Sequence, residues 1–207
     1  MAEIQDIFGK VASGKVGPVT LYVMRGKTIM RGLPRPKESQ RTENQLRNQF
    51  RFKEIRAFCK PFQPVLIPQI WNGLATSSSG YHLFMKTNSP AFDRDGILTD
   101  PMKIRLSMGK LSLPPGMQAK RTVAGGTTIE VKWEKDGPLA VQSATDQLMV
   151  ISAGDGQYSK INATGLTRDK LGGNFELPAL VAPATHLYLF FESLDQRFYS
   201  ESVGLEI

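Results

Sequence analysis

The chain has few of the residues on which metal and redox sites depend. Its 207 residues include one cysteine and two histidines, His82 and His186, and these form no HxxxH, HxH or CxxC spacing. A zinc site would therefore lack ligands, and Cys59 alone cannot form an internal disulfide. We expect no metal and no other cofactor.

Long apolar runs are also missing. No window approaches the roughly 18 uncharged apolar residues of a membrane-spanning helix. The acidic residues Glu3 and Asp6 interrupt the N-terminus, where a secretory signal would be basic and then apolar. The sequence predicts a cytoplasmic protein without membrane contact.

Catalytic motifs are absent as well. Gly26-Lys27-Thr28 resembles the end of a phosphate-binding loop, but Leu21 stands where that motif requires glycine. No GxSxG elbow is present, and Asp93–Gly96 lacks the remaining ligands of a calcium loop. Cys59 has two interpretations: nearby Arg56 would lower the pKa of a reactive thiol, whereas a lone cysteine more often fills space in a core, which we favour. The sequence predicts no enzyme and identifies no small-molecule substrate.

What the chain does have is a basic N-terminal third. Residues 1–60 contain 13 Lys and Arg against 5 Asp and Glu, whereas residues 61–207 contain 13 against 14. Such asymmetry predicts an acidic partner. The residues expected to form the interaction surface are Arg25, Lys27, Arg31, Arg35, Arg47, Arg51 and Arg56.

Two kinds of partner fit this charge. One is a protein with an acidic surface, including another copy of this chain. The other is a nucleic acid bound through the segment 25–60, with Phe50 and Phe52 available for stacking. No zinc finger, RNP motif or recognition-helix pair is present, so we favour a protein partner and keep nucleic acid as the alternative.

The first region combines a hairpin with helices. Extended runs at 18–24 and 27–33, separated by Arg-Gly, predict a β-hairpin. Thr42 and Gln45 have capping-box spacing, which predicts a helix that ends before Pro61. The residues expected to form its buried stripe are Leu46, Phe50, Ile55 and Phe58. A second helix is expected at roughly 69–87, weakened by three serines, and a loop at 88–101.

The second half reads as strands separated by turns. The β-rich runs are 102–114, 127–135, 146–153, 173–180, 185–193 and 197–207. Ile129, Val131 and Trp133 alternate with charged residues, so they predict a buried strand face. Short strands at this spacing are typical of a β-sandwich.

The order of several motifs resembles an uncharacterised family of Bacteroidetes proteins. They are Gly14-Lys15-Val16-Gly17, Arg25-Gly26-Lys27, Arg31, Pro34, Thr42, Gln45 and Arg47, then Leu106-Ser107, Gly109, Leu111, Trp133, Asp146 and Leu148. That resemblance implies an architecture and no activity. The first 60 residues are also similar to proteins of phage and prophage clusters, which implies a role in a phage-like or mobile element.

The C-terminal half resembles a fibronectin type III or immunoglobulin-like domain, with Trp133 where such domains keep a strand-B tryptophan. We therefore predict a mainly β chain, α+β overall. Residues 1–95 would be a basic region with a hairpin and one or two helices, and residues 102–207 an antiparallel β-sandwich. We expect a non-enzymatic structural or protein-interaction module.

Overall fold

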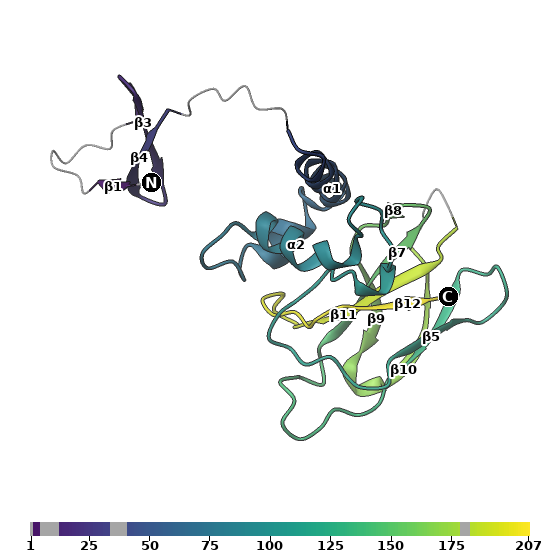
Figure 1. The fold of residues 1–207 in the computed structure, drawn as a ribbon. Coiled ribbons are helices and arrows are strands. Elements are labelled where there is room, and N and C mark those ends of the chain that lie inside the picture. Colours follow the sequence, from purple (N-terminus) through teal and green to yellow (C-terminus); the bar gives the residue numbers. More distant parts are fainter. Residues whose placement is uncertain (1, 5–12, 34–40, 179–182) are drawn as a thin grey trace. The chain divides into compact units, whose positions relative to one another are not determined.

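The computed structural model describes residues 2–4, 13–33, 41–178 and 183–207. Its strands form three antiparallel sheets, accompanied by a few helices, so the chain is mostly β, as predicted. It divides into two compact units, Met1–Thr42 and Glu43–Ile207, and most of their helices and strands are labelled in Figure 1. The second unit starts with the predicted basic helix.

The first unit is a four-stranded sheet in the order β1-β4-β3-β2. Its strands are β1 (Ala2–Ile4), β2 (Gly14–Val16), β3 (Val19–Met24) and β4 (Lys27–Gly32). Strands β3 and β4 form the predicted hairpin, joined by Arg25 and Gly26 at φ 57° and 74°. Positive φ at both turn residues matches the twist of paired strands. The Gly-Lys-Thr sequence therefore belongs to a hairpin turn.

One face of this sheet is apolar, and the other carries basic side chains among apolar and aromatic ones. Leu21 lies opposite Met30 in the β3–β4 register, and these two side chains share one face. Lys27 and Arg31 lie on the other face, because successive side chains of a strand alternate. None of residues 13–33 is buried, so this part of the sheet has no enclosed core of its own.

The second unit begins with a helical layer. Its elements are α1 (Glu43–Cys59), the 3-10 turn η1 (Lys60–Phe62), the π-helical turn η2 (Ile67–Trp71), α2 (Gly80–Asn88), and the 3-10 turns η3 (Ser89–Ala91) and η4 (Pro101–Lys103). Helix α1 begins directly after Thr42 and ends before Pro61, as predicted. The helix expected at 69–87 is split into η2 and α2, and Ser79 caps α2 by accepting a hydrogen bond from the His82 amide.

Two further sheets follow. One has the order β10-β6-β5, with β5 (Gln118–Arg121), β6 (Thr128–Lys132) and β10 (Gly172–Glu176). The other has the order β12-β11-β7-β8, with β9 also paired to β7. Its strands are β7 (Gln147–Gly154), β8 (Gln157–Tyr158), β9 (Asn162–Thr167), β11 (His186–Glu192) and β12 (Val203–Glu206), and the 3-10 turn η5 (Arg168–Lys170) follows β9.

The run at 102–114, predicted as a strand, is largely irregular; its one ladder contact is an isolated bridge from Leu111 to Ser200. Side-chain groups and a few backbone hydrogen bonds, in place of a continuous ladder, bond to its backbone. The Leu106 amide donates a 2.9 Å hydrogen bond to Ser202 Oγ, and its carbonyl oxygen accepts one of 2.9 Å from Trp71 Nε1. The segment therefore contributes apolar side chains to the core without joining a sheet.

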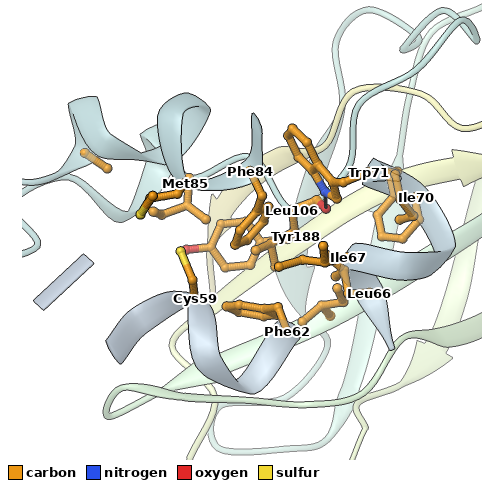
Figure 2. Close-up of a cluster of buried hydrophobic side chains, with 14 of the residues drawn as sticks. Cys59, Phe62, Leu66, Ile67, Ile70, Trp71, Phe84, Met85, Leu106 and Tyr188 are labelled. Atoms are coloured by element: carbon orange, nitrogen blue, oxygen red, sulfur yellow. Dashed lines mark hydrogen bonds between the residues drawn. The ribbon is translucent and has the colours of Figure 1, made fainter. Parts of the chain in front are cut away.

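Strands β7 and β11 are buried on both faces of their sheet. The face toward the other sheet packs in a cluster that includes Leu148, Val150, Leu187, Leu189 and Phe191 with Ile129, Val131 and Phe175. The opposite face packs in a cluster that includes Met149, Ile151, Tyr188 and Phe190 with Phe62, Leu66, Trp71 and Phe84 of the helical layer, part of which is drawn in Figure 2. The five-stranded sheet is thus the middle of three layers.

Arg168 carries a buried charge network beside the sheet–sheet core. Its side chain is 2% exposed and forms ion pairs with Asp136 at 2.9 Å and Asp146 at 3.3 Å. The guanidinium carbon lies 4.2 Å from the centroid of the Phe191 ring. The Arg168 carbonyl oxygen accepts a 3.1 Å hydrogen bond from the Trp133 indole, and Trp133 is buried, as predicted. The network compensates a charge that would be costly to bury alone.

The helical layer belongs to the same compact unit as the later strands. The sequence predicts a basic region at 1–95 and a β-sandwich at 102–207, and leaves open whether the two pack as one unit. Asn88 is fully buried; its amide nitrogen donates a 3.0 Å hydrogen bond to the Arg105 carbonyl oxygen, and its side-chain oxygen accepts one of 2.7 Å from the Arg105 amide. These bonds and the shared apolar cluster hold the segment between Asn88 and Arg105 against the strands.

Candidate interaction surface on helix α1

The seven cations expected to form an interaction surface are divided between the two units. Arg25, Lys27 and Arg31 lie in the hairpin of the first unit, and Arg47, Arg51 and Arg56 lie on α1 of the second. Arg35 lies outside the described residues. The three arginines of α1 differ in their contacts, and these contacts indicate which of them can bind a partner.

Two of these arginines attach α1 to the loop that follows α2. Arg47 forms ion pairs with Glu43 at 3.6 Å and with Asp95 at 3.2 Å. Arg51 Nη2 donates a 2.9 Å hydrogen bond to the carbonyl oxygen of Ser89 and a second one to a nearby carbonyl. Their charges therefore serve the fold at least in part.

Arg56, the third, lines an open groove of about 530 Å³ along α1. Two more cations, Lys53 and Lys60, also line this groove, as do the aromatic residues Phe52 and Tyr81. The side chains of Gln49, Ala57 and Gln63 complete the lining. We call this feature the basic groove.

The basic groove has one sign of charge. Of the described residues that line it, none is acidic. Lys53, Arg56 and Lys60 follow one another along the helical path within about 10 Å, and like charges at this spacing repel one another. The groove therefore has a positive potential that an anion would relieve.

Of the residues that line the groove, Arg56 and Phe52 were named from the sequence as possible contacts of a partner. The sequence did contain a signal for the two lysines, because positions 53, 56 and 60 have the i, i+3, i+7 spacing of one helix side. Tyr81 had no such signal, because it comes from α2 and reaches the groove only through tertiary packing.

The apolar residues at the start of α1 are exposed, which corrects the predicted buried stripe. Leu46 and Phe50 are 51% and 52% exposed. Ile55 is buried, and Phe58 packs partly against the core. Five residues separate Phe50 from Ile55, which rotates the side chain by about 140° around the helix axis. Leu46 and Phe50 therefore cannot lie on the same helix face as Ile55 and Phe58.

The first three turns of α1 are therefore largely accessible to solvent. From Glu43 to Glu54, every side chain is exposed or only partly buried. Leu46 and Phe50 are four residues apart and lie on adjacent turns of one side. We call this pair the contact stripe.

Cys59, His82 and His186 each have defined surroundings in the structure. Cys59 is fully buried, and burial raises the pKa of its thiol to about 12, so its packing role is confirmed. His82 Nδ1 lies 2.8 Å from Ser79 Oγ, and His186 Nδ1 lies 2.7 Å from Thr185 Oγ1. Each histidine is therefore paired with a hydroxyl in its own segment.

The acidic Asp93–Gly96 segment is a polar turn. The Asp93 carboxylate accepts hydrogen bonds of 2.9 Å from the amides of Asp95 and Ile97. Within the described ranges, no group of three or more His, Cys, Asp and Glu residues could hold a metal ion. No helix in the part of the chain that the structure describes has the length and apolar character needed to cross a membrane.

Comparison with known proteins gives no relative: no family model, curated protein or solved structure matches the chain.

Proposed function

We propose that this chain is a non-enzymatic protein-interaction module in which a β body presents the exposed half of α1 to a protein partner. The observation that carries the proposal is the contact stripe. Leu46 and Phe50 are each about half exposed on adjacent helical turns, in a helix whose later residues are anchored in the core.

The strand order supports a fibronectin type III or immunoglobulin-like sandwich as the body. In that architecture, strands A, B and E share one sheet, and strands C, F and G share the other. The first sheet here joins β5, β6 and β10, and the second joins β7, β11 and β12. Strands β8 and β9 pair with β7 where an additional C′ strand would lie. Because such folds carry many functions, the proposal depends on α1.

The contact stripe has the spacing by which helices dock into grooves. Apolar side chains four residues apart lie on one side of a helix, where both can insert into a groove of the partner. A phenylalanine that enters a partner pocket would contribute strongly to affinity, since a few apolar or aromatic anchors dominate most interfaces. Glu43 and Arg47, which flank the stripe, form an ion pair suited to the polar rim of such an interface.

The proposal is tested by adding charge to the stripe. We expect the wild-type chain to associate, either with itself in light scattering or with a protein captured from its native cells. The double variant Leu46→Glu, Phe50→Glu should do neither. Leu139→Glu is the control, because Leu139 is 95% exposed and lies outside α1. A wild-type monomer that captures nothing beyond what the double variant captures would refute the proposal.

A further inference from the structure

We propose that the basic groove binds single-stranded nucleic acid, with its cations on the phosphates and its aromatic rings against the bases. This goes beyond the protein interaction proposed above and depends on different residues. The groove is lined by Lys53, Arg56, Lys60, Phe52 and Tyr81, whereas the contact stripe is Leu46 with Phe50.

The charges of the groove fit a phosphodiester backbone. Three cations lie along one helical path, so a strand that follows α1 can meet two or three of them in succession. Among the described residues, no ion pair occupies Lys53, Arg56 or Lys60, whereas Arg47 is paired with two carboxylates. The three cations would release counterions from a bound strand, which is the main source of affinity for phosphates.

The aromatic side chains distinguish a nucleic acid from a simple anion. Phe52 is 50% exposed at the groove, a costly position for a phenylalanine without a partner. Tyr81 contributes a second ring from α2. Cationic grooves with aromatic faces are the common design for binding unpaired bases, since every base has a face that can stack. Gln49 and Gln63 add amide groups that can bond to base edges.

A single strand fits better than a duplex. The bases of a duplex are stacked on each other and cannot reach Phe52 or Tyr81, so a duplex would use the cations alone. The cations also lie in a groove shared with residues 63 and 81, whereas a helix that reads a duplex must protrude into the major groove.

The test is fluorescence anisotropy of a labelled oligothymidine of about 15 nucleotides, within the usual site sizes for single strands. With three phosphate contacts, the log–log salt dependence should have a slope of about −2. The triple variant Lys53→Gln, Arg56→Gln, Lys60→Gln should weaken binding at least about 10-fold and flatten the slope. The control Lys135→Gln, Lys170→Gln, Arg197→Gln removes the same charge from exposed positions outside the groove and should change binding less than about 3-fold.

The variant Phe52→Ala distinguishes binding of a single strand from binding of other anions. It should weaken oligothymidine binding about 10-fold and leave binding of poly-glutamate and of a duplex of equal length unchanged. Circular dichroism of each variant reports whether the fold is retained, and Lys53→Arg with Lys60→Arg should retain binding. The proposal is overturned if wild type does not bind oligothymidine at about 50 mM salt. It is also overturned if both triple variants lose affinity equally, or if Phe52→Ala has no selective effect.

Discussion

The Arg51 guanidinium donates a 2.9 Å hydrogen bond to the carbonyl oxygen of Ser89, so a cation of the basic segment is used to hold the fold together. Lys53, two positions beyond on the same helix, is exposed and lines the basic groove. The number of basic residues in the sequence therefore overstates the charge available to a partner, because some basic side chains form contacts within the protein.

Arg51→Gln should lower the free energy of unfolding by about 1.5–3 kcal/mol, the usual value of hydrogen bonds made by charged groups. Lys53→Gln is the matched control and should change stability by less than about 0.5 kcal/mol. Urea denaturation followed by circular dichroism measures both. Equal effects of the two substitutions would contradict the structural role of Arg51.

Arg168→Met should destabilise the protein by about 3–5 kcal/mol, because it leaves Asp136 and Asp146 buried without their counter-charge. Arg197→Met removes an arginine that is 79% exposed and pairs with Asp195 at 3.9 Å, and should cost less than about 1 kcal/mol. Thermal unfolding of the two variants provides the comparison. An Arg168→Met protein as stable as wild type would show that the buried network contributes nothing net.

Alkaline pH should destabilise the fold. Burial raises the pKa of Cys59 from 9.0 to about 12, and that of Tyr158 from 10.0 to about 12. The unfolded chain would lose these protons first, so stability is complete below about pH 9 and falls as pH rises toward 12. Tyr158→Phe should make the decline between pH 10 and 12 shallower, by about 2 kcal/mol over that range. A variant with the same pH dependence as wild type would show that Tyr158 does not titrate in this way.

Local sequence patterns predicted part of the local structure, although the run at 102–114 is largely irregular and strands β5, β8 and β9 lie outside the predicted β-rich runs. Alternation and an Arg-Gly turn predicted the β3–β4 hairpin, and a capping box with a downstream proline predicted both ends of α1. The continuous apolar runs of β7 and β11 are typical of strands buried on both faces, and helices cover the second face. The sequence could not predict which helices cover that face, since their position depends on packing across the whole unit.

The candidate site was predicted only in part. Arg56 belongs to the basic groove, but Arg47 and Arg51 are engaged with the loop after α2. Phe50 was assigned to the core, although the helical rotation between it and Ile55 excludes a shared face. Tyr81 could not have been found, because a groove between two helices exists only once they have packed.

The most direct test of the contact stripe is photo-crosslinking in native cells, with a photoreactive phenylalanine analogue at position 50 or, as a control, at position 139. Phe50 is 52% exposed and Leu139 is 95% exposed, so the control position is at least as accessible to solvent as position 50. We predict a discrete protein adduct from position 50, none from position 139, and loss of the adduct when Leu46→Glu is added. No adduct from position 50, or the same adducts from both positions, would contradict the proposal that α1 presents an interaction surface.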